Sequence, residues 1–217
     1  MSDISKQLTQ VADQLRALST NGLIYTDDPY QIERYQKIKK LSAQLLSIAD
    51  SRPQHEIEHI LFEDIAYKTP MSTVDTAVFD ECGQILLIQR ADSGKWALPG
   101  GACDVGEPPS TGAVREVWEE TGYVASVSAL LGVFDSFVWH DTTSSRHMYH
   151  FLFGGYVVGG EAKTSLETLD VRWFSADDAP WDTMSSTHPA RIRHAFQWYT
   201  DRTTVAFFDP TDWTPSA

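Results

Sequence analysis

The chain has 217 residues, of which 42% are hydrophobic and 22% are charged, and this balance is typical of a globular protein rather than a disordered one. Its 17 basic and 30 acidic residues give a formal net charge of -13 at pH 7, which is opposite in sign to the surface that nucleic-acid binding requires. The composition therefore favours a small phosphate-bearing ligand over a long polynucleotide, although it still allows an RNA end.

The sequence has no run of about 18 or more apolar residues, and its first residues lack the basic-then-apolar layout of a secretory signal. Its two cysteines, Cys82 and Cys103, are too few for a disulfide framework, which favours a reducing compartment. We therefore expect a cytoplasmic protein with no membrane partner.

Residues 1–66 are expected to be helical. Asn21-Gly22 is expected to end the first helix, a second helix begins near Asp28-Pro29, and a short third helix follows Pro53. A helical hairpin alone cannot bury the apolar stripes of such helices, so we expect this region to help form a homodimer interface; the alternative is a cap over the rest of the chain. The first stripe, with spacings of three and four residues, consists of Ile4, Leu8, Val11, Leu15 and Leu18.

His55 to His59 reads H-E-x-x-H, which is the pattern of a zinc protease. The pattern requires a longer helix and a third ligand further along the chain, and neither is recognisable in the sequence. We therefore interpret the two histidines as solvated or partly packed side chains.

From Met71 onward the pattern changes to alternating and β-branched residues. A turn at 80–83 is expected to join the first two strands into a hairpin, and Gly100-Gly101 is expected to be a turn. This order of elements indicates an α/β sandwich, with a mixed sheet between helices. Strands are expected at 72–79, 84–89, 95–98, 124–138, 147–158 and 171–174, and a final helix at 191–199.

A helix from about Pro109 to Thr121 carries the most informative residues. Proline is favoured in the first turn of a helix and glycine just after the last, so Pro109 and Gly122 bracket it. Glu116, Glu119 and Glu120 share one face at i, i+3 and i+4, where their charges repel unless a cation lies among them. Hard divalent ions take such oxygen ligands, so the pattern predicts a metal site; a solvated acidic face is the alternative.

The whole pattern from Gly101 to Gly122 resembles the box of the Nudix hydrolases, with Tyr123 as a soft departure where an aliphatic residue is usual. The resemblance implies an α/β/α sandwich with a mixed sheet, here preceded by a small helical N-terminal domain. We expect the helical region at 1–66, the hydrolase domain at 70–203 and a C-terminal tail at 204–217. The residues that match the box are Gly101, Glu107, Arg115, Glu116, Glu119, Glu120 and Gly122.

Over roughly residues 20 to 200 the chain looks like a bacterial Nudix group that has a helical N-terminal domain. That group includes ADP-ribose and CDP-choline pyrophosphatases. The resemblance implies hydrolysis of a pyrophosphate bond in a nucleoside diphosphate joined to a second group, with Mg²⁺ or Mn²⁺, releasing a nucleoside monophosphate. Alternatives are a nucleoside triphosphate or RNA-end hydrolase that uses the same site, and a nucleotide-sensing transcription regulator.

The resemblance also implies residue roles. Glu116 and Glu120 are the expected principal metal ligands, with Glu119 beside them and the carbonyl of Gly100 or Gly101 as a further ligand. Glu107 and Arg115 are expected to lock the loop to the helix.

Glu167 lies at the position where this group often has its general base. Glu161, Asp170 and Glu119 are the alternative candidates for that role. The sequence does not identify the second group of the substrate or its base. Candidates for substrate contact are Arg90, Phe134, Trp139, His147 and Tyr149.

Overall fold

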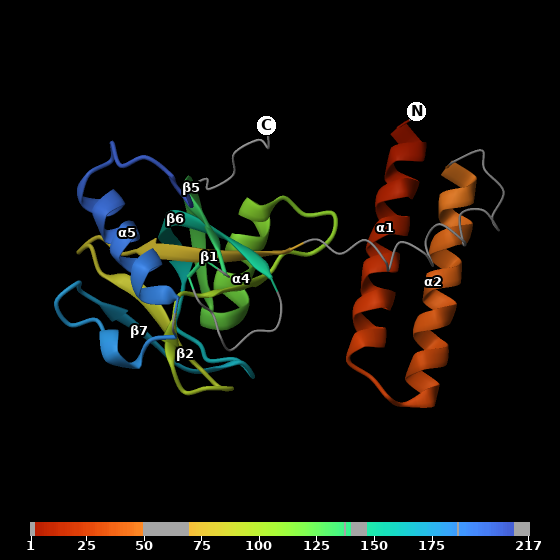
Figure 1. Cartoon of the computed structure of the whole chain (residues 1–217), viewed down its shortest axis with the longest axis horizontal. Coiled ribbons are helices and arrows are strands. Elements are labelled where there is room, and N and C mark those ends of the chain that lie inside the picture. Colours follow the sequence, from red (N-terminus) through yellow and green to blue (C-terminus); the bar gives the residue numbers. More distant parts are fainter. Residues whose placement is uncertain (1–2, 50–69, 137, 140–146, 186, 211–217) are drawn as a thin grey trace, which may run out of the picture. The chain divides into compact units, whose positions relative to one another are not determined.

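The computed structural model describes residues 3–49, 70–136, 138–139, 147–185 and 187–210 (Figure 1). The chain divides into two compact units: residues 1–69 with 104–106, and residues 70–103 with 107–217. Within the described ranges, no helix is both long enough and apolar enough to cross a membrane.

The first unit contains α1 (Asp3–Ile24) and α2 (Pro29–Ala49), which confirms a helical N-terminal region. The expected end of the first helix at Asn21-Gly22 is wrong, because α1 continues to Ile24. Glycine serves packing here: a Cβ on Gly22 would lie 2.3 Å from the ring of Tyr35. Asp28 begins α2 by accepting a hydrogen bond from the backbone N–H of Tyr30 at 3.0 Å. The third expected helix and the His55–His59 pair lie outside the described residues.

Small and polar residues, rather than the predicted apolar stripe, lie buried within this unit. Ala12 and Ser19 of α1 are buried, as are Ser42 and Ala43 of α2. The Ser42 hydroxyl donates to the carbonyl of Ala12 at 2.6 Å, so the two helices approach closely. Part of the apolar stripe stays exposed on α1: the exposed fractions of Ile4, Val11 and Leu18 are 69%, 46% and 63%, while Leu8 and Leu15 are half-buried.

The second unit is built on one mixed sheet with the strand order β3-β2-β1-β6-β5-β8, where β4 also pairs with β1 and β7 with β2. The pairs β1–β6 and β5–β8 are parallel and the others are antiparallel. The strands are β1 (Met71–Phe79), β2 (Ile85–Arg90), β3 (Trp96–Ala97), β4 (Gly100–Ala102), β5 (Tyr123–Asp135), β6 (Met148–Gly160), β7 (Thr168–Phe174) and β8 (Phe207–Phe208). The helical elements are α4 (Pro109–Thr121), the 3₁₀ turn η2 (Trp181–Thr183) and α5 (His188–Thr200).

Three details of the sheet differ from the sequence prediction. The expected hairpin closes only at the pair Phe79 and Ile85, since β1 then pairs with β4 and β6. Gly100-Gly101 belongs to a strand, not only to a turn, and a Cβ on Gly100 would lie 2.1 Å from the carbonyl oxygen of Val74. The tail contributes a strand, because Phe207 and Phe208 pair with β5.

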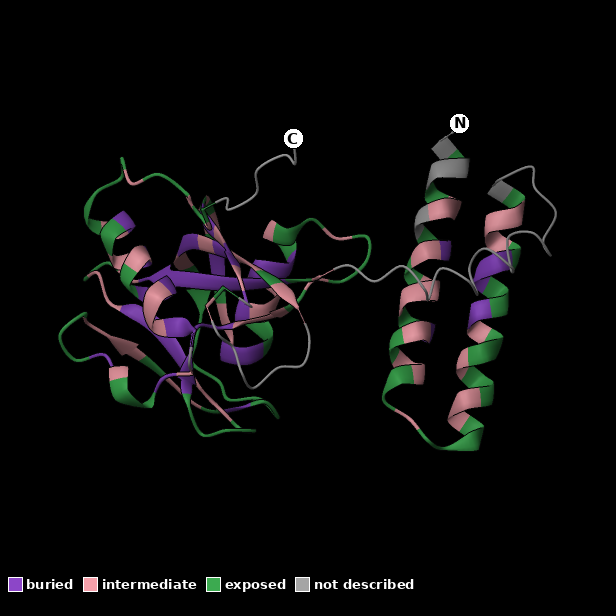
Figure 2. Cartoon of the chain, in the orientation of Figure 1, coloured by how far each residue is buried: buried purple, intermediate pink, exposed green. Residues whose placement is uncertain are grey.

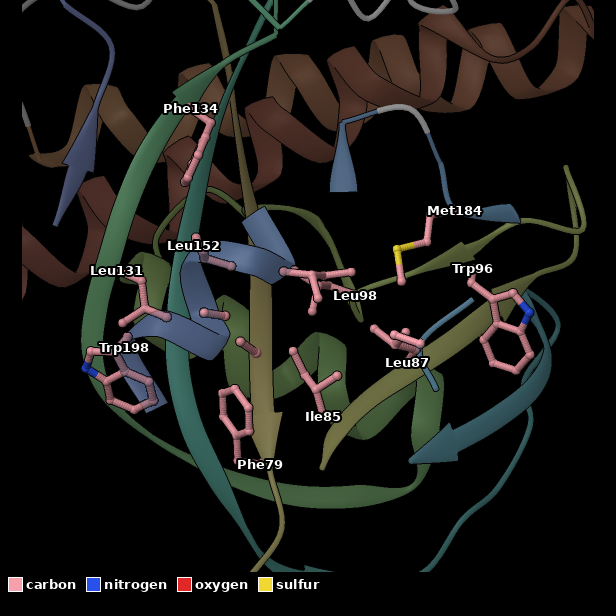
Figure 3. Close-up of a cluster of buried hydrophobic side chains, with 14 residues drawn as sticks. Phe79, Ile85, Leu87, Trp96, Leu98, Leu131, Phe134, Leu152, Met184 and Trp198 are labelled. Atoms are coloured by element: carbon pink, nitrogen blue, oxygen red, sulfur yellow. The ribbon is translucent and has the colours of Figure 1, made fainter. Parts of the chain in front are cut away.

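Strand alternation divides the core into two layers, because successive side chains of a strand point to opposite faces. Ala77, Phe79, Ile85 and Leu87 belong to a large cluster with residues of α5 (Figure 3). Val78 and Leu86 instead join Val117 of α4 on the other face. Burial is concentrated on β1 and β2 (Figure 2), which confirms a mixed sheet between helices.

We predict that Leu87→Ala lowers the free energy of unfolding by about 2 to 5 kcal/mol, because Leu87 is fully buried and its removal leaves a cavity. The matched control is Leu169→Ala in β7, where the side chain is 57% exposed and a change within about 0.5 kcal/mol is expected. Urea denaturation of the two variants measures the difference. Equal losses would contradict the assignment of Leu87 to the core.

Candidate active site

Helix α4 presents its glutamates because its other face is anchored to the sheet. Ala113 and Val117 are fully buried, and Thr76 of β1 donates to the carbonyl of Ala113 at 3.1 Å. The helix ends at Gly122, which has φ 75° and donates its N–H to Trp118 O at 2.9 Å. The bounds Pro109–Thr121 agree with the sequence prediction. Tyr123 packs its ring on Trp173 at 5.5 Å, so the departure at this position concerns packing.

Arg115 connects the box loop to the helix. Its guanidinium donates to Glu107 and Glu116 at 2.8 Å each, to Glu119 at 3.0 Å, and to the carbonyl of Ala102 at 3.2 Å. The hydrogen bond to Glu107, together with the charge of Glu116, raises the pKa of Arg115, so the cation is permanent. Arg115 thus balances part of the negative charge of the cluster.

Glu120 is the most buried carboxyl of the cluster, with 5% of its surface exposed. Its Oε2 accepts a hydrogen bond from the N–H of Gly100 at 2.8 Å. Burial raises the pKa of Glu120 to about 8, against the effect of the Gly100 amide, and the charges of Glu116 and Glu167 raise it further. Burial also raises the pKa of Glu116, although Arg115 opposes that shift. The site therefore holds carboxyl groups whose ionisation is disfavoured without an additional cation.

Among the described residues, no group of three or more His, Cys, Asp or Glu side chains is arranged to hold a metal ion. The reason is that Arg115 draws Glu116 and Glu119 to itself, while Glu120 is turned to the Gly100 amide. The donor set itself fits a hard divalent cation, since it consists of carboxylate oxygens in a poorly solvated place. Glycine is also required beside it, because a Cβ on Gly101 would lie 2.7 Å from Oε1 of Glu116.

A cavity of about 510 Å³ opens beside Glu120, and Glu167 and Arg90 line it as well. The carbonyl of Glu167 accepts the N–H of Ala91 at 2.9 Å, which holds the two loops together. Arg90 pairs with Asp92 at 2.7 Å, and this hydrogen bond lowers the pKa of Asp92 to about 2. The structure thus brings together Glu120 and two candidates, Glu167 and Arg90, that lie far from it in the sequence.

The four predicted aromatic and imidazole contacts lie elsewhere, and none lines the cavity beside Glu120. Phe134 is buried in the core and stacks on Phe207 at 4.5 Å. Trp139 donates its Nε1–H to Asp209 at 3.0 Å. His147 contacts Asp135 at 2.9 Å, and the ring of Tyr149 lies 5.3 Å from that of His147. Their hydrogen bonds and packing account for these positions.

The sequence analysis missed a second cavity, of about 560 Å³, that reaches Gly100 and Gly101. Its lining includes Asp75, His188 and Arg191, none of which belongs to the box. His188 is buried, which holds its pKa well below the usual value, and its Nδ1 accepts the N–H of Leu98 at 3.2 Å. A charged residue within an otherwise uncharged strand was the available signal for Asp75.

We predict that the metal-free protein loses stability as the pH rises from about 5 to about 8. The folded state keeps a proton on Glu120 up to a pKa of about 8, whereas the unfolded chain releases it near the ordinary glutamate pKa of 4.5. This stabilising contribution is therefore complete below the unfolded pKa and lost as pH rises through the folded pKa. The glutamine of Glu120→Gln cannot ionise. With a chelator present, the unfolding free energy of this variant should therefore fall less between about pH 5 and about pH 8 than that of the wild type.

Denaturant titrations at a series of pH values measure the slope. Glu81→Gln is the control, because Glu81 is an exposed residue outside the cluster. Identical slopes for Glu120→Gln and the wild type would show that Glu120 is already ionised in the folded protein.

Comparisons with known proteins agree with this geometry. The model of the NUDIX domain matches residues 69–199, and the model of the UDP-X-like N-terminal oligomerisation domain matches residues 6–61. The "Putative ADP-ribose pyrophosphatase YjhB" of Bacillus subtilis (strain 168) is 30% identical over 207 residues, which cover 94% of this chain and 99% of that protein.

Two solved structures are similar as well. A UDP-X diphosphatase superposes with a TM-score of 0.59 at 28% identity, covering 91% of this chain and 96% of its own. An ADP-ribose pyrophosphatase of Streptococcus suis 89-1591 has a TM-score of 0.53 at 27% identity, covering 60% and 92%. With a domain match over more than half of its length and a relative matched nearly end to end, the chain belongs to the Nudix hydrolase family.

Proposed function

We propose that the chain hydrolyses the pyrophosphate bond of a nucleoside diphosphate joined to a second group, and releases a nucleoside monophosphate. The observation that carries the proposal is the buried Glu120, which has Glu116 and Glu167 nearby and a cavity beside it. The names of the similar UDP-X diphosphatase and ADP-ribose pyrophosphatase support this substrate class.

Nudix hydrolases generally use divalent metals, and we propose Mg²⁺ or Mn²⁺ for this chain. Glu116, Glu119, Glu120 and the carbonyl of Gly100 would hold the ion. When bound, the ion supplies charge neutralisation at the phosphoryl oxygens and a lower pKa for a coordinated water.

The other residues position and transfer protons. In the proposed reaction the oxygen of a water molecule forms a bond to phosphorus, the bridging P–O bond breaks, and the bridging oxygen leaves with the second phosphate. Glu167 accepts the proton of the water, since it lines the same cavity as Glu120. Arg90 pairs with Asp92 through Nε and Nη2, and its Nη1 group would bind phosphoryl oxygens in the cavity. Arg115 and Glu107 keep the loop at the helix.

The substrate class is tested with a panel of ADP-ribose, CDP-choline, a nucleoside triphosphate and a short RNA, each incubated with Mg²⁺ or Mn²⁺. We expect release of nucleoside monophosphate from at least one of the two diphosphate conjugates, measured by chromatography. Turnover of the triphosphate or the RNA alone would favour the alternative hydrolase functions. No turnover with either metal, together with specific binding of a DNA duplex, would favour the regulator.

In the same assay, Glu120→Gln should lower kcat by about 100-fold or more, because the amide replaces a charged ligand of the ion. Its fold should persist, since an amide of the same shape still accepts the Gly100 N–H. Glu81→Gln is again the control and should keep the wild-type rate. A normal rate for Glu120→Gln would remove this residue from the site.

We further propose that the chain is a homodimer through its helical unit. The model of the N-terminal oligomerisation domain matches this region, and the chain leaves large apolar residues of both helices in solvent. On α2, the exposed fractions of Leu41 and Ile48 are 55% and 72%, and these residues are spaced by seven like Val11 and Leu18 of α1. Two copies bury such stripes against each other.

Leu18→Glu tests the dimer by sedimentation, because a charge in the apolar stripe opposes association. We expect a shift from dimer to monomer at a concentration where the wild type is dimeric. Gln36→Glu adds the same charge at an exposed position of α2 away from the stripe, and should leave the dimer unchanged. A monomeric wild type would contradict the homodimer, and a Leu18→Glu variant that stays dimeric would place the interface elsewhere.

A further inference from the structure

The second cavity contains polar residues that the proposed catalytic roles do not use. It reaches Gly100 and Gly101 of β4 and shares Arg90 and Asp92 with the cavity beside Glu120. A pyrophosphate held at the glutamates would therefore have one end directed toward each cavity.

Asp75 of β1 and Arg191 of α5 form an ion pair deep in this cavity. Asp75 is 6% exposed and Arg191 is 1% exposed. The Nη2 and Nε groups of the guanidinium donate to Thr187, whose hydroxyl and carbonyl oxygens accept from them. Thr187 thus holds the guanidinium of Arg191 beside the carboxylate of Asp75.

Thr73 and His150 extend this polar surface. They are partners in the parallel pair of β1 and β6, and Oγ1 of Thr73 lies 2.7 Å from Nδ1 of His150. The same nitrogen lies 3.6 Å from Oδ2 of Asp75. Because Thr73 and Asp75 point to the same face of β1, all three groups are fixed by the strands that carry them.

A buried ion pair of this kind contributes little net stability, since the cost of removing two charges from water offsets their attraction. Apolar side chains of similar volume would hold α5 on the sheet as well. The pair lines a cavity together with other buried polar residues, which favours a role in binding over a role in stability alone.

The cavity walls restrict the chemistry of the ligand. Met71, Leu98 and Met148 offer apolar surface, and none of the described residues that line the cavity is Phe, Tyr or Trp. A quaternary ammonium group is bound by aromatic rings, so choline does not fit this lining. A planar heterocycle does, because its faces can contact the apolar walls while its edge meets the polar residues.

We propose that this cavity binds the nucleobase, and that Asp75, positioned by Arg191, accepts a hydrogen bond from an N–H donor on the base edge. Thr73 and His150 complete the polar edge of the site. The inference rests on the proposed function, and it assigns the second group of the substrate to the cavity beside Glu120. That cavity is lined by Leu166, which is fully exposed, so it places few restrictions on the second group.

Binding is measured first, without metal or turnover, by calorimetry with AMP, GMP, CMP and UMP and with ribose 5-phosphate as the base-free reference. We expect at least one nucleotide to bind about 10-fold or more tightly than ribose 5-phosphate. Asp75→Asn should reduce this ratio, because an amide cannot replace both acceptor oxygens. Equal affinity for all five compounds would overturn the proposal, whether or not the protein hydrolyses any substrate.

Thr73→Val and Thr76→Val form a matched pair on β1 that keeps the experiment informative if Asp75→Asn unfolds. Both threonines are buried, but Thr73 contacts His150 in the cavity, whereas Thr76 bonds to α4 on the opposite face. Thr73→Val should reduce the preference for the base about 10-fold, and Thr76→Val should leave it unchanged. An equal effect of the two variants would indicate a structural role and contradict the assignment.

Turnover separates this inference from the proposed function. In the first series, the glucose conjugates of adenosine, guanosine, cytidine and uridine diphosphate are compared by kcat/KM. In the second series, the nucleoside is always adenosine and the second group is varied. The proposal expects a larger spread across bases than across second groups, and a smaller base spread in Thr73→Val. Cleavage of all conjugates with no base preference would overturn the inference alone, whereas cleavage of none would count against the proposed function.

Discussion

The structure depends on a carboxyl group that is kept out of water among other carboxyl groups. Glu120 lies under the amide of Gly100, and this contact requires β4 to press against β1 where only a glycine fits. Burial and the neighbouring charges raise the pKa of Glu120. Carboxyl groups whose ionisation is disfavoured in this way are typical of functional sites. A bound cation is the simplest species that would stabilise their charged forms.

Strand β1 is the element that connects the two functional regions. Its odd-numbered residues carry Thr73 and Asp75 into the second cavity, while Thr76 on its other face bonds to the helix of the glutamates. Its edge pairs with β4 and so fixes Gly100 opposite Asp75. One strand therefore sets both the position of the acidic cluster and the polar surface beside it.

The sequence was sufficient for the features that depend on local spacing. The bounds of α4 follow from Pro109 and Gly122, the shared face of its glutamates from helical spacing, and the mixed sheet between helices from the order of the elements. It was insufficient where distant segments meet. Asp75 and Arg191 are 116 positions apart, and Gly100 pairs with Asp75 of β1, which belongs to a different segment of the chain.

The aromatic residues illustrate the same limit. The strand pattern predicts that the side chains of Phe134 and its neighbours alternate between the two faces of the sheet. It does not predict the residue on which Phe134 stacks, which is Phe207 of the C-terminal segment. The N-terminal helices show a different limit: periodicity identified the apolar stripe, yet the buried contact between the helices uses Ala12 and Ser42.

The guanidinium of Arg115 has a consequence for the order of folding and metal uptake. It offsets part of the repulsion among the glutamates, and the proton retained by Glu120 removes another negative charge. The chain can therefore fold before any ion arrives, unlike small domains whose folding waits for their metal. Binding of the proposed ion would then be an exchange: Glu120 would release its proton to solvent, and some of the ion pairs between Arg115 and the glutamates would break.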